Sequence, residues 1–270
     1  MTAFLEIKDV TKSYWSDDGK RETPVVTEMS LKINAGEMIM FLGPSGCGKT
    51  TLMRIIGGLE QQSSGQIFLE GDLLGKPDRR RGMVFQSYSS FPWLTVRQNI
   101  AFGLRYRSDI SAAEKHDITE HYLELVGLGQ FGDFFTNRIS GGMRQRVAIA
   151  RTLAAAPDLL LMDEPFGALD ALTREFLQMQ LLEINARENK TTIFVTHDVE
   201  EAVLMAHRIF IFSARPARII EEIDVTKIIP LADRAKGAKE SEAFFTLRNR
   251  ILKILRDEYR RVAELEENSA

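Results

Sequence analysis

The sequence predicts an α/β protein in which parallel strands are covered by helices. The first observation is a set of short runs of apolar and β-branched residues, at 38–42, 159–162, 191–195 and 209–212. The second is a helical pattern between two of these runs, with apolar side chains at Leu172, Phe176, Met179, Leu182 and Ala186. Alternation of short strands with helices is typical of a parallel sheet.

The first part of the chain reads as strand, loop and helix. Apolar Met29, Leu31 and Ile33 alternate with polar residues, which is the period of a half-buried strand, and residues 34–36 then turn the chain. The continuous apolar run at 38–42 predicts a buried strand. A glycine-rich loop follows it at once, and the residues after that loop, to about Ile56, predict a helix.

The middle of the chain, about residues 87–156, lacks strand patterns and predicts an inserted helical subdomain. Ser111 and Glu114 have the spacing of a capping box, and Ile118, Tyr122 and Leu125 follow at helical spacing. These signals place at least one helix inside the insertion.

The C-terminal part predicts a linker at 230–240 and a helix at 241–270. The helix has an apolar face made of Phe244, Leu247, Ile251, Leu255, Tyr259 and Val262. We interpret it as a cover for its own domain; a regulatory role and a dimer contact stay open.

The composition limits the class of protein. The chain has 270 residues, 44% of them hydrophobic, and a formal net charge of −3, so we expect no nucleic acid among its partners. The single cysteine, Cys47, excludes an internal disulfide and favours the cytoplasm. Residues 1–10 include Glu6 and Asp9 and do not resemble an export signal, and the apolar runs fall far short of the ~20 residues that cross a bilayer.

The glycine-rich loop fits the pattern G-x-x-x-x-G-K-[ST] of a phosphate-binding loop. Its residues are Gly43, Pro44, Ser45, Gly46, Cys47, Gly48, Lys49 and Thr50. The glycines let backbone N–H groups curve around an anion, and the helix N-terminus adds roughly half a positive charge. The alternative, a glycine-rich turn with a solvated lysine, is disfavoured by the strand before the loop and the helix after it.

Each polar residue of this loop has an expected role toward ATP and Mg²⁺. Lys49 would bridge the β- and γ-phosphates, Thr51 would contact the α-phosphate, and the Thr50 hydroxyl would bind the metal, which prefers oxygen ligands. Cys47 is then part of the loop backbone and has no redox role.

Two carboxylates follow the apolar run at 159–162. Asp163 can hold Mg²⁺ through water, and Glu164 can orient and deprotonate the attacking water, because phosphoryl transfer depends on positioning and charge stabilisation. An Asp-Glu pair can also be a simple strand terminus, but the phosphate loop upstream favours the catalytic interpretation.

A second anion site is predicted at residues 139–146, Ile-Ser-Gly-Gly-Met-Arg-Gln-Arg. Ser140 can cap a helix that begins near Gly141, and Gly141 and Gly142 leave backbone N–H groups open to a phosphate. The segment resembles the signature motif of ABC transporter ATPases. Ile139 and Met143 differ from the usual Leu and Gln; Met143 cannot make the polar contacts of glutamine, so a ribose contact across subunits is not carried over to it.

The resemblance implies a P-loop NTPase with a RecA-like mixed sheet core, an N-terminal antiparallel β subdomain and an inserted helical subdomain, together forming an ATPase domain at 1–229. It also implies a head-to-tail homodimer, or a pair of related ATPases. In such a dimer, Ser140 and Gly142 of one subunit bind the γ-phosphate of ATP held by the phosphate loop of the other.

Four further residues match family elements in the expected order. Tyr14 resembles the aromatic that stacks on adenine, and Gln86 the residue that senses magnesium and water. Asp170 resembles the residue of the loop that crosses the dimer, and His197 the histidine that contacts the γ-phosphate and the catalytic water. Taken singly, Tyr14 could pack, Gln86 could lie at the surface, Asp170 could cap a helix and His197 could be structural.

Residues 91–96, 141–146, 165–170 and 215–216 look like those of importers of nitrate, sulfonates or taurine. This resemblance implies membrane-spanning permease subunits, an extracytoplasmic solute-binding protein, and a peripheral location on the cytoplasmic face of the membrane. We expect the loop aromatics Tyr88, Phe91 and Trp93 either to receive a permease helix or to pack within the helical subdomain.

The sequence argues against two other functions. A non-transport ABC-type ATPase acting on nucleic acid or ribosomes would usually carry long coiled coils or two ATPase domains. A regulatory module that binds ATP without turnover would most naturally lack Glu164 or His197. The remaining histidines, His116, His121 and His207, match no motif and are interpreted as surface or packing residues.

Overall fold

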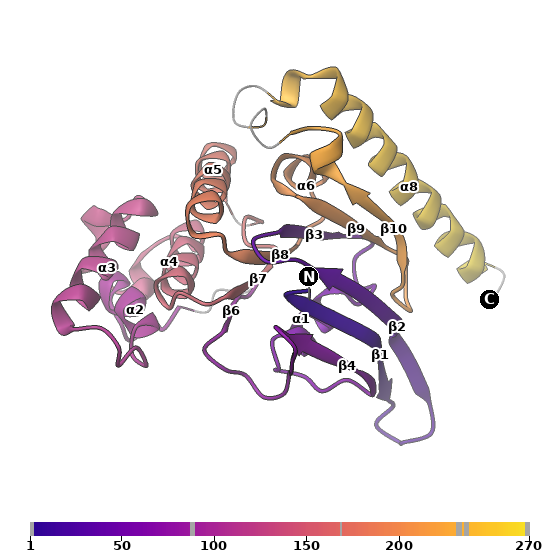
Figure 1. The fold of residues 1–270 in the computed structure, drawn as a ribbon, viewed down its shortest axis with the longest axis horizontal. Coiled ribbons are helices and arrows are strands. Elements are labelled where there is room, and N and C mark those ends of the chain that lie inside the picture. The colour runs from indigo at the N-terminus through magenta and orange to yellow at the C-terminus, as the bar shows by residue number, and fades with distance from the viewer. Residues whose placement is uncertain (1–2, 87–89, 168, 231–233, 235–237, 268–270) are drawn as a thin grey trace. The chain divides into compact units, whose positions relative to one another are not determined.

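The computed structural model describes residues 3–86, 90–167, 169–230, 234 and 238–267, with side chains described as far as Val262. The chain forms two compact units, Met1–Pro77 with Asn189–Ala270, and Asp78–Glu188 (Figure 1). We call them unit 1 and unit 2 and describe each by itself. None of the helices within the described residues is long and apolar enough to cross a membrane.

Unit 1 contains three of the four predicted parallel strands. Strand β3 (Met38–Leu42) pairs in parallel with β8 (Thr191–Val195) on one side and with β9 (Arg208–Phe212) on the other. Strand β10 (Ile219–Asp224) adds an antiparallel edge beside β9, so the sheet is mixed. Every residue of β3 and β8 is buried, as expected for central strands covered on both faces. Helices α1 (Lys49–Ile56) and α6 (Val199–Met205) belong to this unit.

A second, antiparallel sheet forms the N-terminal part of unit 1. Its order is β2 (Glu22–Ile33), β1 (Leu5–Trp15), β4 (Ser64–Leu69) and β5 (Asp72–Leu73). Leu5 lies opposite Ile33 on one side and Leu69 on the other, and all three are buried. Strand β2 begins at Glu22, seven residues before the alternation seen in the sequence. Its first three residues are exposed, and the buried Val25 and Val26 are adjacent, so this part of the strand does not alternate.

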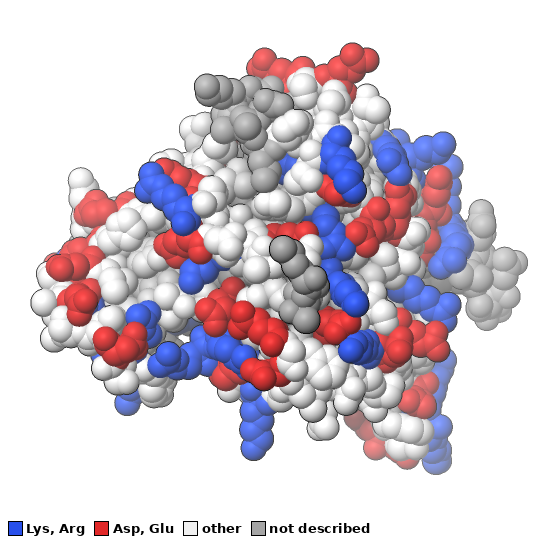
Figure 2. Space-filling model, viewed as in Figure 1, with Lys and Arg blue, Asp and Glu red and all other residues white. Residues whose placement is uncertain are grey.

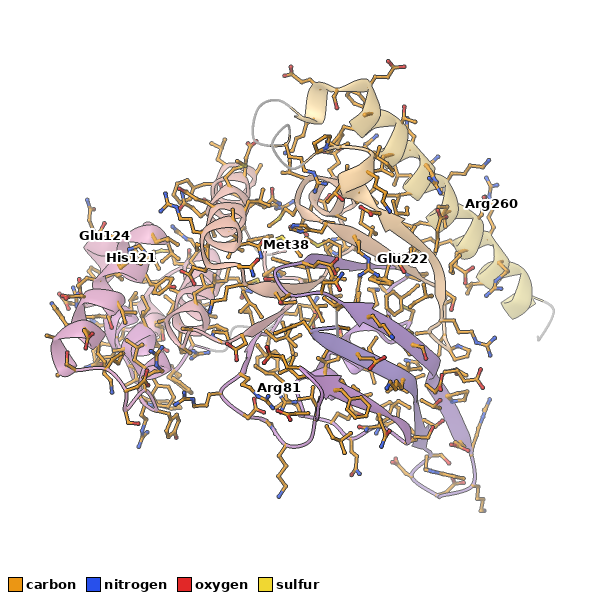
Figure 3. The ribbon with its side chains drawn as sticks, in the orientation of Figure 1. Met38, Arg81, His121, Glu124, Glu222 and Arg260 are labelled. Atoms are coloured by element: carbon orange, nitrogen blue, oxygen red, sulfur yellow. The ribbon has the colours of Figure 1, made fainter. Side chains whose placement is uncertain are left out.

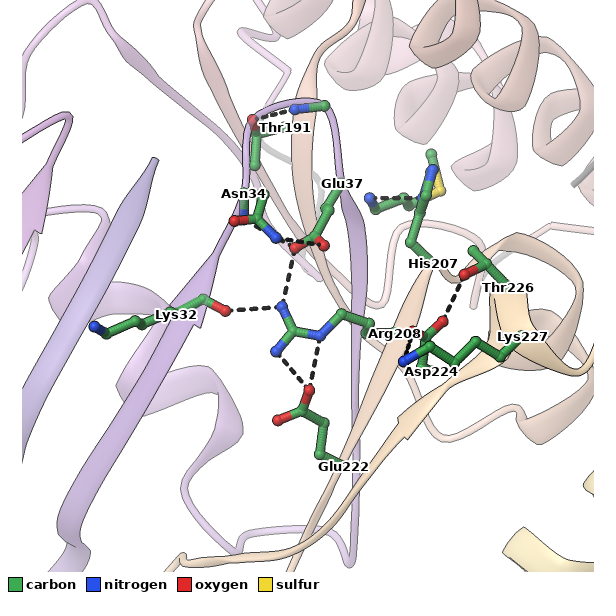
Figure 4. Close-up of polar contacts among 12 residues, drawn as sticks. Lys32, Asn34, Glu37, Thr191, His207, Arg208, Glu222, Asp224, Thr226 and Lys227 are labelled. Atoms are coloured by element: carbon green, nitrogen blue, oxygen red, sulfur yellow. Dashed lines mark hydrogen bonds and ion pairs between the residues drawn. The ribbon is translucent and has the colours of Figure 1, made fainter. Parts of the chain in front are cut away.

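The two sheets of unit 1 are connected by a network around Arg208, at the start of β9 (Figure 4). The Arg208 guanidinium donates to Glu37 Oε2 at 3.0 Å and to the Lys32 carbonyl at 2.8 Å. It also donates from Nε and Nη2 to Glu222 Oε1, at 2.9 and 2.6 Å. One side chain thus joins the end of β2, the turn before β3, and β10.

His207 is a packing residue, as interpreted from the sequence. Its Nδ1 accepts from the Met38 backbone N–H at 2.9 Å. Burial lowers its pKa, with a further contribution from the charge of Arg234, so the ring remains a neutral acceptor. His116 and His121 are exposed, and Figure 3 shows His121 on α3.

The C-terminal helix α8 (Glu242–Glu267) packs against α6 in unit 1. Short 3₁₀ turns, η3 (Val225–Lys227) and η4 (Ala238–Glu240), precede it. Phe244, Leu247 and Ile251 are buried, as predicted.

The prediction was wrong for Tyr259, which is 54% exposed, whereas Glu258 is buried at 7% exposure. The seven residues from Ile251 to Glu258 make about two helical turns, so Glu258 returns to the buried side and Tyr259 lies roughly 80° away from Ile251. A carboxylate therefore occupies a position where the pattern suggested an apolar residue.

Unit 2 contains the parallel pair β6 (Arg81–Val84) and β7 (Leu159–Asp163). Its helices are α2 (Val96–Gly103), α3 (Ala112–Leu125), α4 (Gly141–Ala154) and α5 (Ala171–Glu188), with 3₁₀ turns η1 (Gly129–Phe131) and η2 (Thr136–Arg138). The capping box expected at α3 is confirmed, with Glu114 N–H donating to Ser111 Oγ at 3.2 Å and Ser111 N–H to Glu114 Oε2 at 2.7 Å. The limits of the helical subdomain at 87–156 and of the linker at 230–240 stay predictions.

Candidate functional site

The phosphate loop, residues 43–50, connects β3 to α1 in unit 1, so the strand and helix expected around it are confirmed. Lys49 is only 6% exposed. Its Nζ donates to the carbonyl oxygens of Gly43 and Pro44, both at 2.8 Å, and lies 3.6 Å from Cys47 Sγ. The ammonium group is therefore held inside the loop.

The backbone of this loop requires glycine. Gly46 and Gly48 have φ values of 72° and 125°, which side-chain-bearing residues rarely adopt. A Cβ at Gly48 would lie 2.8 Å from the carbonyl oxygen of Val25. Among the described residues no side chain caps the first turn of α1, and that turn holds no acidic residue. The turn therefore suits an anionic ligand.

Thr50 and Thr51 are half-buried in the first turn of α1. His197 is exposed just beyond β8. The residue after it, Asp198, caps α6 by accepting from Glu200 and Glu201 N–H at 2.9 and 3.1 Å. Because β3 and β8 are parallel and Phe41 pairs with Val195, the phosphate loop and His197 leave the same edge of the sheet.

Tyr14 lies near the end of β1 and is 41% exposed. Its hydroxyl donates to Glu60, and the Lys12 ammonium lies 4.8 Å from the centre of its ring. Partial burial, and next the bond with Glu60, raise the pKa of the phenol. The ring is therefore held in one place while part of it stays accessible.

In unit 2, the structure brings Gln86 and Glu164 together. Val84 in β6 pairs with Met162 in β7, and Gln86 and Glu164 each lie two residues beyond this pair. Gln86 Nε2 donates to Glu164 Oε2 at 2.9 Å. Glu164 has a φ of 47°, a conformation that costs on the order of 1 kcal/mol for a residue with a side chain. Its carboxylate is thus fixed both by its backbone and by a neighbouring amide.

Asp163, the last residue of β7, is 4% exposed. A carboxylate buried to this degree needs polar or ionic partners. Its carboxylate offers oxygen ligands, the kind that Mg²⁺ prefers. The residue types therefore fit the expected metal.

The predicted N-cap of α4 is confirmed. The exposed Ser140 has extended backbone angles, and its Oγ accepts from the Met143 backbone N–H at 3.2 Å. Met143 thus contributes to the turn through its main chain. Arg144 adds a bond from Nη1 to the Ile139 carbonyl at 2.8 Å.

Gln145 is a positioning residue that the sequence reasoning missed. It is 1% exposed, and its Nε2 donates to the Phe85 carbonyl, at 3.4 Å. The bond connects α4 to the residue just before Gln86. Gln145 lies inside the segment 139–146 that the sequence analysis singled out, but between two arginines, so no apolar pattern marked it as buried.

Asp170 acts as a cap for α5 in this chain, which was one of its two interpretations. Its Oδ1 accepts from Thr173 N–H at 3.0 Å, and this bond lowers the pKa of the exposed carboxyl. A role across a dimer stays a prediction. Ala168, in the same motif, lies outside the described residues.

The loop aromatics divide into packed and exposed residues. The ring of Phe91 lies 4.7 Å from that of Phe102, and the Arg151 guanidinium lies 4.8 Å from its centre. Trp93 is 68% exposed and lies 5.4 Å from Phe91, centre to centre. Tyr88 lies outside the described residues. Phe91 therefore packs within the helical part of unit 2, whereas most of the Trp93 side chain is exposed.

Comparison with known proteins identifies the family. Residues 26–167, more than half of the chain, match the family model described as ABC transporter. The chain therefore belongs to the ABC transporter family, and its fold is that of an ABC ATPase cassette, a P-loop NTPase.

Two relatives are named for their cargo. The chain is 45% identical over 222 residues to the nitrate import ATP-binding protein NrtD of Synechocystis sp. (strain ATCC 27184 / PCC 6803 / Kazusa), covering 82% of each chain. It is 40% identical over 250 residues to the aliphatic sulfonates import ATP-binding protein SsuB of Bacillus anthracis, covering 92% of this chain and 94% of SsuB.

A solved structure is also similar. It is the dimeric, post-hydrolysis form of the ATP-binding cassette MJ0796 bound to ADP and Pi, with a TM-score of 0.75 and 32% identity. The match covers 82% of this chain and 98% of that cassette.

Proposed function

We propose that this chain is the ATP-binding and ATP-hydrolysing subunit of an ABC importer for a small anion such as nitrate or a sulfonate. The observation that carries hydrolysis is the Gln86–Glu164 pair, because a carboxylate held by an amide at the ends of two parallel strands is suited to orient a water molecule. The names of NrtD and SsuB support import and the class of cargo.

ATP binding is assigned to unit 1. Lys49, now bonded to loop carbonyls, exchanges these partners for the β- and γ-phosphates, and the backbone N–H groups of residues 45–50 surround the phosphate oxygens. Thr51 contacts the α-phosphate, and the part-exposed ring of Tyr14 stacks on adenine.

Hydrolysis is assigned to Glu164 as general base, with Gln86 and His197 orienting the water and the γ-phosphate. Thr50, Asp163 and Gln86 would hold Mg²⁺, which neutralises charge on the phosphates when bound. Lys49 stabilises the negative charge that develops on the transferred group.

The catalytic assembly is proposed to be a head-to-tail dimer. Ser140, Gly141 and Gly142 at the start of α4 would contact the γ-phosphate held by the partner's loop, and Asp170 would lie at the dimer interface. The dimeric state of the MJ0796 cassette supports this arrangement.

The dimer would work at the cytoplasmic face of the membrane on permease subunits that receive cargo from an extracytoplasmic solute-binding protein. The exposed Trp93 is a candidate contact for a permease helix. Within the chain, we assign residues 1–229 to the ATPase domain, with 87–156 as its helical subdomain and 230–240 as a linker.

Acidic and basic side chains are interspersed over the face drawn in Figure 2, in line with the net charge of −3. This distribution gives no support to a nucleic-acid substrate. It is one reason for preferring transport over an ATPase that acts on nucleic acid.

The proposal is tested with the transporter purified as a complete complex in lipid vesicles. Uptake of nitrate or a sulfonate should require ATP, and Lys49→Ala should abolish both uptake and ATP hydrolysis. Trp93→Ala should reduce uptake and leave basal hydrolysis within about twofold, because an exposed aromatic contributes to a contact and not to the fold. ATP-independent uptake, or hydrolysis unaffected by Lys49→Ala, would refute the proposal.

A further inference from the structure

The turn between β9 and β10, residues 213–218, lies against the phosphate loop; we call it the β9–β10 turn. Arg215 Nη2 donates to the carbonyl oxygen of Gly46 at 3.1 Å. At the end of the loop, a Cβ added to Gly48 would lie 3.2 Å from the Cβ of Ala217. The turn therefore touches the loop both through a hydrogen bond and through close packing.

The β9–β10 turn is itself held in a fixed shape. Ser213 Oγ accepts from Arg218 N–H at 3.0 Å and donates to the Pro216 carbonyl at 3.0 Å. Ala217 N–H donates to the Val25 carbonyl at 2.8 Å, which ties the turn to β2. A rigid turn can transmit the position of one neighbour to another.

Helix α8 also contacts the β9–β10 turn. Glu258 Oε1 accepts from Ala214 N–H at 2.8 Å and from Arg261 Nη2 at 3.0 Å. Ala214 directly precedes Arg215. Burying a carboxylate is costly unless it is hydrogen-bonded, so a helix that only covered its domain would be expected to carry an apolar residue here.

The bond from Arg215 fixes the direction of one peptide group in the phosphate loop. Because the peptide unit is planar and trans, the carbonyl of Gly46 and the N–H of Cys47 point in opposite directions. Cys47 N–H points to Pro44 O, at 3.4 Å, and Lys49 Nζ donates to the same oxygen. With its carbonyl held outward by Arg215, this peptide therefore turns its N–H toward the interior of the loop.

We propose that Arg215 and Glu258 are positioning residues for ATP, through which the C-terminal helix sets the geometry of the phosphate loop. Glu258 holds the β9–β10 turn, the turn presents Arg215, and Arg215 directs the Cys47 N–H toward the phosphate. This inference rests on the proposed binding of ATP by that loop. It assigns α8 a role in nucleotide affinity as well as in covering α6.

The test is a titration of the full-length chain with a fluorescent N-methylanthraniloyl derivative of ATP in the presence of Mg²⁺. The wild type and Lys49→Ala test the proposed function first, since binding must be present in the one and lost in the other. Arg215→Ala should raise the Kd about threefold to tenfold, the effect of one lost charge-assisted bond at a partly exposed site. Arg215 is exposed, so this change leaves folding intact.

Two variants of Glu258 separate the effect of loop geometry on nucleotide affinity from the effect of the negative charge. Glu258→Leu removes the acceptor and should raise the Kd about threefold, although removal of a negative charge by itself would favour an anionic ligand. Glu258→Gln also removes the charge but keeps an acceptor for Ala214 N–H, and should stay near the wild-type Kd. Arg250→Ala breaks a different contact of α8, with Glu221 on β10, and is the matched control.

Coupling between the two positions is the decisive result. If they act in one chain of contacts, the double variant Arg215→Ala with Glu258→Leu should have about the same Kd as Arg215→Ala alone. The proposal is overturned if the Kd is unchanged by Glu258→Leu, if Glu258→Gln or Arg250→Ala weakens binding as much as Glu258→Leu, or if the two effects multiply. Loss of binding in the wild type would instead contradict the proposed function.

Discussion

Replacement of Glu164 by Gln is the sharpest test of the proposed chemistry. Glutamine keeps an acceptor for Gln86 Nε2, which lies 2.9 Å from Glu164 Oε2, and it keeps the size of the side chain. The change therefore removes the basic carboxylate with little change in geometry. Loss of a general base predicts a fall in kcat of at least ~100-fold, or about 2.7 kcal/mol in the activation barrier.

The neighbouring amide provides a matched comparison. Gln86→Ala keeps the base but removes the amide that orients it and that is proposed to contact Mg²⁺ and the water, so kcat should fall by at least about tenfold, but less than in Glu164→Gln, which loses the base itself. The assay is steady-state release of phosphate by the purified subunit at saturating Mg-ATP, with binding of the fluorescent ATP derivative measured in parallel. Glu164→Gln must still bind nucleotide. Turnover within about tenfold of wild type in Glu164→Gln would remove Glu164 from the role of base.

Three further predictions concern caps, protons and glycine. Ser140→Ala removes the N-cap of α4 and should cost about 1 kcal/mol in the free energy of unfolding, with turnover lower by at least about tenfold; unchanged turnover would separate the cap from catalysis. Burial lowers the pKa of His207 in the folded state. The neutral ring therefore contributes its full stability above the ordinary pKa of 6.5, and this contribution is lost as the pH falls through the folded pKa. His207→Gln should flatten the fall of Tm below pH 6.5, and the control His116→Gln should not. Gly48→Ala should lower the unfolding free energy by at least about 1 kcal/mol in urea, whereas Gly75→Ala, at an unstrained position with open space around it, should have little effect.

Local motifs made much of the fold and site readable from the sequence. The phosphate loop follows β3 and begins α1, Ser140 caps α4, and Ser111 forms a capping box, because each depends on neighbours within a few residues. The central strands are buried on both faces and so appear as continuous apolar runs. Alternation predicted only the last part of β2, because Val25 and Val26 before it are adjacent, and the antiparallel sheet as a whole was expected through the family resemblance.

Contacts between distant residues could not be predicted in this way. The bond from Ala214 to Glu258 spans 44 residues, and that from Arg208 to Glu37 spans 171 (Figure 4). In the sequence, Glu258 is one charge among many in a charged helix. Helix geometry puts it on the side of Ile251, but only the tertiary fold supplies the Ala214 N–H that makes a buried carboxylate acceptable there.

The central claim is that ATP is held between the phosphate loop of one copy and the Ser140 turn of another. The most direct test is the molar mass of Glu164→Gln in solution, measured by light scattering with and without ATP. The account predicts the mass of one chain without ATP and of two chains with it, and a single-chain mass in both conditions when Ser140→Arg is added to obstruct the turn. A mass that does not respond to ATP, or ATP-dependent pairing that survives Ser140→Arg, would contradict it.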